Sequence, residues 1–352
     1  MKKVLAILLA LAMLLSFAAC GEKKEEQPEE PKDEGIGDSL VLYTSMTDSD
    51  IDALLTNFNE VYPDCEVEIV TGSIGELIAR IQAEKDNPQG DVVWGGLQDS
   101  DGDTYKDLFE QWVSEHCKDN LPDYVSCNNF YSINHLSPVC FCVNLELEKE
   151  LGLKIESYED LLNPALKGKI ILSDPNSSSA AWNNLCNMFA VYGYDTDAAW
   201  NYIEKFMENV VIVGSSSKCF KDIDAGEYVV GLTYEDGAVK LLADGSTAVE
   251  MRYPTEGSSA SAFAGAVIKG AKNMKAAKAL VDFVCSAEGQ TKMSEYMEGT
   301  LRFTNTKMKV SDKSWLCDSS DIKWVNRPVK ELTDGKEAIL NHWNELIAKV
   351  QK

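Results

Sequence analysis

The stretch Gly168-Lys-Ile-Ile-Leu-Ser-Asp-Pro-Asn-Ser-Ser-Ser-Ala-Ala-Trp182 joins a short apolar run to a segment of helical character. The apolar run predicts a buried strand, the proline a turn, and the serines the start of a helix that continues to about Tyr192. Backbone N–H groups at a helix N-terminus point outward with the positive end of the helix dipole behind them, which suits an anion. An ordinary N-cap at one of Ser177, Ser178 and Ser179 explains the same pattern. The stretch therefore predicts a strand–turn–helix junction and leaves anion binding open.

The same alternation of strand and helix continues along most of the chain. Strands are expected at residues 39–44, 65–71, 91–94, 170–172, 210–213 and 228–232, each followed by a short loop. Such alternation predicts an α/β fold with a mostly parallel sheet, whose ligand crevice lies at the carboxyl ends of the strands. The loop residues expected to bind a ligand there are Thr44, Ser45, Ser73, Gly95, Gly96, Ser177, Ser178, Ser179, Trp182, Ser215, Ser216, Thr233, Tyr234, Glu235 and Asp236. Helix capping alone is the alternative explanation for these loops.

The N-terminus has the pattern of an export signal. Two lysines precede the apolar run Val4–Phe17, which is too short to span a bilayer comfortably, and small residues lead to Cys20. These small residues resemble a bacterial lipobox, although Phe17 stands where Leu is usual. The resemblance implies that residues 1–19 are removed and that Cys20 is lipidated, which anchors the protein on the extracytoplasmic face of the cell membrane. A soluble exported protein is the alternative. Residues 20–37 are charged and poor in apolar side chains, so we expect a disordered tether.

The charge balance limits the possible partners. The 352-residue chain has a net charge of -24, which argues against nucleic acid and against a basic lipid-binding face. An anion site must therefore be built locally from dipoles and a few cations. Arg80, Arg252 and Arg302 are candidate anion partners because a guanidinium binds phosphate with two parallel hydrogen bonds. Each could instead form an ion pair.

The sequence holds little that would support catalysis or a metal. It contains no Gly-x-Ser-x-Gly, His-Glu-x-x-His or phosphate-loop lysine motif, so we expect a protein that is not an enzyme and needs no cofactor. Its ten cysteines are scattered, mostly in apolar surroundings, and read as small core residues. No histidine stands at a zinc-ligand spacing from a cysteine pair. A redox pair among the cysteines remains open.

As a whole the chain resembles the substrate-binding proteins of bacterial ABC importers, in the branch that binds ferric iron, phosphonates and sugar phosphates. The segments that carry the resemblance are Leu42-Tyr-Thr-Ser45, residues 75–85, residues 87–96, Ser173-Asp-Pro175, Gly231-Leu-Thr-Tyr-Glu-Asp236 and residues 263–268. It implies a type II periplasmic-binding-protein fold, in which two α/β lobes close over the ligand. Lobe 1 is then expected at residues 38–140 plus 267–352 and lobe 2 at 141–266, with hinge crossings near 140–144 and 263–267. The resemblance also implies a monomer that delivers its solute to permease subunits.

The ligand is open between two chemistries. Iron-binding members present two adjacent tyrosines as hard oxygen ligands, whereas this chain has Tyr234 alone, with Glu235 and Asp236 beside it. The hydroxyl-rich loops favour a small organic anion such as an organic phosphate, phosphonate or sugar phosphate. Trp94 and Trp182 could stack on the ligand or belong to the core. Ferric iron is the alternative, followed by a thiamine-type ligand or a sensor lipoprotein that does not transport.

Overall fold

The computed structural model describes residues 35–98, 104–125, 129–312 and 314–350. Contacts within the chain divide it into residues 1–35 and 36–352, and all elements named below belong to the second unit. The expected signal, the lipidation site Cys20 and nearly all of the tether lie outside the described residues.

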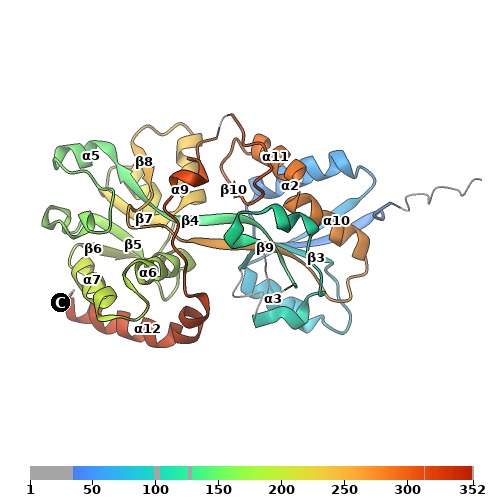
Figure 1. Ribbon diagram of the computed structural model, residues 1–352, viewed down its shortest axis with the longest axis horizontal. Helices are drawn as coiled ribbons and strands as arrows, with labels where there is room; N and C mark the ends of the chain where they lie inside the picture. Colours follow the sequence, from blue (N-terminus) through green and yellow to red (C-terminus); the bar gives the residue numbers. More distant parts are fainter. Residues whose placement is uncertain (1–34, 99–103, 126–128, 313, 351–352) are drawn as a thin grey trace, which may run out of the picture. The chain divides into compact units, whose positions relative to one another are not determined.

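In the described residues ten strands form one hydrogen-bonded arrangement that β4 (Ser132–Asn144) divides into two sheets (Figure 1). The first sheet contains β1 (Ser39–Thr44), β2 (Glu66–Thr71), β3 (Val92–Gln98), β9 (Ala260–Val267) and β10 (Arg302–Phe303). β1 pairs in parallel with β2 and β3, whereas β9 runs antiparallel to both β3 and β4. The second sheet contains β5 (Ile170–Ser173), β6 (Val210–Val213), β7 (Val230–Tyr234) and β8 (Val249–Arg252). Here β5 is parallel to β6 and β7, and β4 is antiparallel to β7 and β8.

Helices cover both faces of the first sheet because its strands are apolar on both sides. Leu40 and Leu42 face α2 (Asp48–Val61) and α10 (Met274–Cys285), and the neighbouring Tyr43 packs with α3 (Ile74–Ala83). This is the alternation that a pleated strand requires. Helix α11 (Ala287–Tyr296) packs against α2 and α10.

The second sheet is covered in the same way. One face packs on α6 (Ser179–Tyr192) and α7 (Asp197–Met207), and the other on α8 (Lys218–Asp224) and α9 (Glu235–Ala243). Helix α5 (Leu145–Glu150) follows β4 directly. The short 3₁₀ helices are η1 (Lys106–Leu108), η2 (Glu115–Asp119), η3 (Pro122–Tyr124), η4 (Asp160–Leu162), η5 (Pro164–Leu166) and η6 (Ser319–Asp321).

The chain passes between the sheets near the expected places, with one correction. β4 pairs with β9 up to Pro138 and with β7 from Val139, just before the crossing expected at residues 140–144. The second passage lies between β8 and β9. The crossing expected at residues 263–267 is wrong, because β9 pairs with strands of the first sheet along its whole length.

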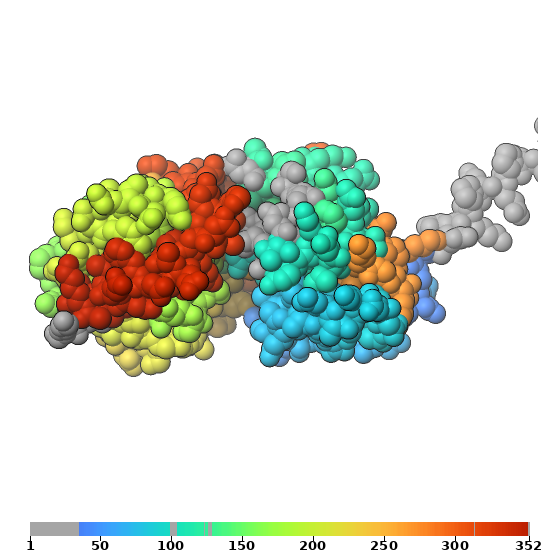
Figure 2. All heavy atoms as spheres, turned by 90° about the horizontal axis from the view of Figure 1, so that it is seen from below, coloured from blue at the N-terminus to red at the C-terminus, as the bar shows by residue number. Residues whose placement is uncertain are grey.

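The C-terminal helix α12 (Val329–Val350) gives a second correction. Its buried residues Leu332, Ile339, Trp343 and Leu346 form one stripe that joins the core of the second sheet, with Tyr158 among its neighbours. Figure 2 shows this helix in red along the yellow-green surface of that half, and α12 packs against α7. The lobe boundary expected from sequence placed this helix with the first sheet.

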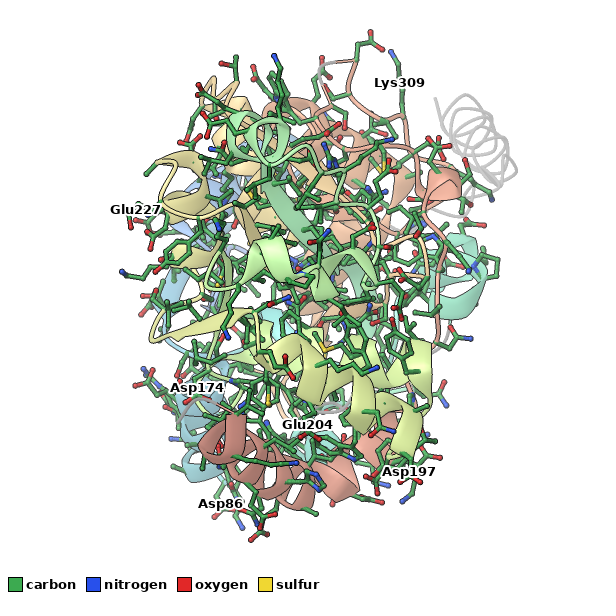
Figure 3. The ribbon with its side chains drawn as sticks, turned by 90° about the vertical axis from the view of Figure 1, so that its left-hand side faces the viewer. Asp86, Asp174, Asp197, Glu204, Glu227 and Lys309 are labelled. Carbon is green, nitrogen blue, oxygen red and sulfur yellow. The ribbon has the colours of Figure 1, made fainter. Side chains whose placement is uncertain are left out.

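Acidic side chains lie on the surface of the second half. Figure 3 shows Asp197 and Glu227 at the outline of the molecule, with Asp174 and Glu204 on the same face. The negative net charge is thus carried in part by solvated groups. Among the described residues, no helix is both long and apolar enough to span a bilayer.

Candidate functional site

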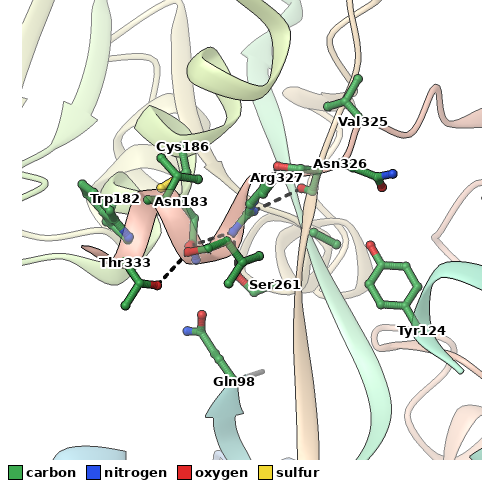
Figure 4. Close-up of a pocket in the computed structure, with 14 residues that line it drawn as sticks. Gln98, Tyr124, Trp182, Asn183, Cys186, Ser261, Val325, Asn326, Arg327 and Thr333 are labelled. Atoms are coloured by element: carbon green, nitrogen blue, oxygen red, sulfur yellow. Dashed lines mark hydrogen bonds between the residues drawn. The ribbon is translucent and has the colours of Figure 1, made fainter. Parts of the chain in front are cut away.

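A pocket of about 260 Å³ lies where residues of both sheets meet (Figure 4). Gln98, at the end of β3, and Tyr124 in η3 line it from the first half. Trp182, Asn183 and Cys186 line it from α6 of the second half. The wall is completed by residues 259–261, at the passage from β8 to β9, and by 325–333, which lead into α12. The pocket lies at the carboxyl end of β3, where a ligand crevice is expected in an α/β fold.

Arg327 supplies a positive charge at the wall of the pocket. Its Nε donates to Ser259 Oγ at 2.6 Å and its Nη1 to Asn183 Oδ1 at 2.9 Å. Further bonds run from Nη1 to Ser261 Oγ at 3.3 Å and from Nη2 to the Ser259 carbonyl at 3.3 Å. The acceptors lie on α6, on β9 and at Ser259 just before β9, so they fix the plane of the guanidinium. Because these bonds use most of its N–H groups, the guanidinium offers a ligand chiefly a fixed positive charge at the pocket wall, which favours an anion.

Neutral polar groups, apolar side chains and the rings of Tyr124 and Trp182 line the rest of the pocket. Ser259 and Ser261 are 1% and 2% exposed, and the Thr333 hydroxyl donates to the Val329 carbonyl at 2.8 Å. The Trp182 ring packs on the core of the second sheet, and Lys336 Nζ lies 4.9 Å from the ring centroid. The pocket thus combines one cation, hydroxyls, amides and two aromatic rings, a combination that binds small polar organic molecules.

Residues 53–315 match the family described as bacterial extracellular solute-binding protein. The chain belongs to this family. It is a solute-binding protein of an ABC importer with the type II periplasmic-binding-protein fold, as the sequence resemblance implied. Members of the family are binding proteins, and the expectation that this chain is not an enzyme rests on that family membership alone.

Three proteins to which this solute-binding protein is similar are an AfuA structure, an uncharacterized protein and a protein named for a phosphonate. The periplasmic binding protein AfuA of Actinobacillus pleuropneumoniae, solved with exogenous fructose-6-phosphate bound, is 27% identical with a TM-score of 0.72, over 89% of this chain and 99% of its own. An uncharacterized protein of Haemophilus influenzae is 26% identical over 86% of this chain and 89% of its own. A putative 2-aminoethylphosphonate-binding periplasmic protein of Salmonella typhimurium is 25% identical over 66% and 68%.

The structure describes all of the loop residues that the sequence predicted to bind a ligand. Of these residues, Trp182 lines the pocket and the others do not. The loops of the first sheet have structural roles. The buried Thr44 hydroxyl donates to the Trp94 carbonyl at 2.7 Å and accepts from Met46 N, and Ser73 caps α3 in a capping box with Glu76. Trp94 is fully buried and its indole N–H donates to Asn134 Oδ1. Of the two roles considered for it, it therefore has the one in the core.

Ser45 and Gly96 do meet, although outside this pocket. Gly95 and Gly96 have φ of +77° and +75°, a conformation that favours glycine. A Cβ at Gly96 would lie 1.9 Å from Ser45 Oγ. The glycine pair is therefore required by the close approach of the two loops.

The serine loops of the second sheet make local turn bonds, and in one of them Ser178 caps a helix with its side chain. Ser178 Oγ accepts from Ala181 N at 3.2 Å, which is the N-cap bond of α6, and Ser177 N donates to the Asp174 carbonyl. Ser179 is the exposed first residue of α6. Ser215 Oγ lies 3.0 Å from Ser217 Oγ, and the Ser216 carbonyl accepts from Cys219 N. Helix capping thus accounts for Ser178, and turn bonds within the loops account for Ser177, Ser215 and Ser216.

The acidic residues after β7 are engaged within the protein. Glu235 is 1% exposed and its Oε1 lies 2.7 Å from Nη2 of Arg302. Asp236 accepts a hydrogen bond from Ser137, and desolvation raises the pKa of its carboxyl to about 6. Desolvation also raises the pKa of Tyr234 to about 12, with the nearby Asp236 acting in the same direction. The adjacent Thr233 is buried in β7.

The three arginines selected from sequence are all in ion pairs. Arg80 pairs with Glu84 at 2.8 Å on an exposed helix face, and Arg252 donates to Glu148 Oε2 at 3.0 Å and to Glu250. Arg302 pairs with Glu235. The fourth arginine of the sequence, Arg327, was missed because the resemblance ended near residue 305. Its sequence position could have pointed to it, because Arg327 is an isolated arginine next to Pro328, just before the amphipathic helix α12 begins.

Proposed function

We propose that this solute-binding protein captures a small organic anion, a phosphate ester or phosphonate, in the pocket beside Arg327 and delivers it to the permease of an ABC importer. The orientation of the Arg327 guanidinium by Ser259, Ser261 and Asn183 supports the anionic class most directly. A charged donor that is already oriented loses little freedom on binding.

The size and lining of the pocket favour a small solute with hydroxyl or amino groups beside its anionic end. Its volume of about 260 Å³ is below the range of about 300–1,000 Å³ usual for ligand pockets. Gln98, Asn183 and Thr333 offer neutral polar groups for such substituents. One similar structure was solved with fructose-6-phosphate bound, and one relative is named for 2-aminoethylphosphonate; both compounds are small organic phosphorus compounds.

The pocket is lined by residues from both halves of the protein, which favours a mechanism in which the halves close over the ligand. Residues at the end of β3 and on α6 belong to different sheets, and a ligand that contacts both stabilises the arrangement in which they are close. We therefore expect an open state without solute and a closed state with it. Small-angle scattering should show a smaller radius of gyration once a binding solute is added, and an unchanged radius at saturation would refute closure.

Ferric iron is the second candidate, because a curated relative in Synechocystis is named iron uptake protein A1. Tyr234 with Glu235 or Asp236 would be the ligands. The ion pair of Glu235 and the raised pKa of Tyr234 both disfavour that arrangement, because iron binding requires a free carboxylate and a phenolate. In the described residues no group of three His, Cys, Asp or Glu could hold a metal ion.

A thermal-shift panel tests the proposed function. The panel contains fructose-6-phosphate, 2-aminoethylphosphonate, ferric citrate, thiamine and sulfate, because a ligand of the native state raises the melting temperature. We expect a rise with an organic phosphate or phosphonate that is lost in Arg327→Gln and kept in Arg80→Gln. A rise confined to ferric citrate, or one that Arg327→Gln leaves intact, would overturn the proposal.

We further propose that Cys20 carries the lipid that holds the monomeric protein on the extracytoplasmic face of the membrane. The lipobox-like sequence before Cys20 supports this, and the family itself is extracellular. Metabolic labelling with a fatty acid should mark the wild type and not Cys20→Ala. Equal labelling of both would refute the anchor.

A further inference from the structure

Two cysteine side chains from distant parts of the sequence meet beneath β4. Cys117 lies in η2 and Cys285 is the last residue of α10, and both are held as thiols. Both donate to the same acceptor, the carbonyl of Ile133, with S–O distances of 3.8 and 3.9 Å. They are 4% and 0% exposed, so the packing of η2 on α10 holds the sulfurs together.

The surroundings of Cys117 differ from those of the other buried cysteines. Desolvation raises the pKa of Cys142 and Cys186 to about 12 and that of Cys219 to about 11. The pKa of Cys117 is lowered instead, chiefly because the Cys285 thiol can donate a hydrogen bond to the Cys117 thiolate. A thiolate is the form that attacks a disulfide, so Cys117 has the better surroundings for that reaction.

A surface pocket lies next to the segments that carry the pair, although neither cysteine itself lines it. It has a volume of about 320 Å³ and is lined by His116, next to Cys117 in sequence, and by Ser286, next to Cys285. Asp282 and Phe283 also line it. A disulfide of low molecular weight can therefore approach the pair from this side after a small local opening.

We propose that Cys117 and Cys285 form a disulfide when the protein meets a small disulfide oxidant outside the cell. The Cys117 thiolate attacks one sulfur of the oxidant and releases the other as a thiolate, which leaves a mixed disulfide. The Cys285 thiolate then attacks the Cys117 sulfur and releases the second half of the oxidant as a thiolate. In sum, two protein thiols are oxidised by two electrons and the oxidant is reduced to two thiols.

The bond would fix the connection between β3 and β4 to the end of α10. Because the two cysteines are far apart in sequence, the bond would close a long loop in the unfolded chain and so stabilise the native state. Cys140 and Cys142 provide a comparison within the same protein. They are two residues apart on one strand, and a bond between them would close almost no loop.

Treatment of the purified full-length chain with 2-hydroxyethyl disulfide tests the proposal. We expect a protein lighter by two hydrogen atoms, one linked peptide pair containing Cys117 and Cys285, and a higher melting temperature that dithiothreitol reverses. Cys117→Ser should abolish the linked pair and Cys142→Ser should not. Mapping of the wild type decides the result even if a variant folds poorly. Linkage of other cysteines, or adducts at Cys117 that never resolve to this pair, would overturn the proposal.

Discussion

Nη2 of Arg302 lies 2.7 Å from Oε1 of Glu235, and the two side chains belong to different sheets. Arg302 is in β10 of the first sheet, whereas Glu235 begins α9 on the second. The side chains are 4% and 2% exposed, and the Tyr253 hydroxyl also donates to Glu235. A second link runs from Lys240 on α9 to Asp50 on α2 at 3.6 Å. Charged contacts thus join the two halves beside the strand that crosses between them.

Replacing Arg302 by Met should be strongly destabilising, because it leaves the Glu235 carboxylate buried without its cation. We expect a loss of about 3–5 kcal/mol in the free energy of unfolding. Urea denaturation measures it, with Arg80→Met as the control, whose exposed pair should contribute less than about 1 kcal/mol. Equal losses in both variants would show that the buried pair has no special role.

Asp236 should make stability depend on pH in a defined direction. Its folded pKa of about 6 is above the usual value of about 3.9, so the folded state binds the proton more tightly than the unfolded state. Its contribution to stability is fully present below about pH 4 and is lost as the pH rises through about 6. The wild type should therefore lose stability relative to Asp236→Asn over this range in denaturation experiments. A constant difference between the two proteins would contradict the shift.

Replacing Ser177, Ser178 and Ser179 together by Ala separates capping from binding. If these serines bound the anion, as the sequence suggests, the triple variant would lose the stabilisation that the ligand gives. The structure makes Ser178 the cap of α6, so we expect a loss of about 1 kcal/mol in unfolding free energy and an unchanged thermal shift with fructose-6-phosphate. If the variant keeps its stability and loses the shift, the serine loop is the anion site after all.

Gly96→Ala should destabilise the protein by about 1–3 kcal/mol because it combines a positive φ with a close contact to Ser45. Gly152→Ala is the matched control, since Gly152 has a φ of +65° and no atom within 4 Å of the added methyl group. Chemical denaturation of both variants should show the larger loss in Gly96→Ala. A larger loss in the control would mean that the contact with Ser45 is readily relieved.

Sequence patterns predicted the parallel strands β1, β2, β3, β5, β6 and β7, but not the antiparallel strands β8, β9 and β10. The apolar runs and capping signals predicted strands such as β1 and β5 and the start of α3, because each depends on neighbouring residues. The family followed from short motifs distributed along the chain. Placement of α12 could not be predicted, because its apolar stripe fits either half and only the tertiary packing decides.

The candidate site was harder to predict for a physical reason. Serine and threonine at a strand–helix junction can satisfy backbone groups or bind a ligand, and the local sequence is the same in both cases. Ser178 and Ser73 proved to be caps. Arg327 lies far along the chain from Asn183 and Ser259, and their meeting depends on how the last segment returns across the molecule.

The role of Arg327 in anion binding is tested most directly by calorimetric titration of Arg327→Gln beside the wild type. The titrants are fructose-6-phosphate and 2-aminoethylphosphonate, and Arg80→Gln is the control. Loss of hydrogen bonds from a charged donor should weaken binding by about 10- to 100-fold. The melting temperature of each variant without ligand shows whether it is folded. We expect wild-type binding of at least one compound, weakened in Arg327→Gln and retained in Arg80→Gln. No binding of either compound, or equal affinity in a folded Arg327→Gln protein, would contradict the assignment of this pocket.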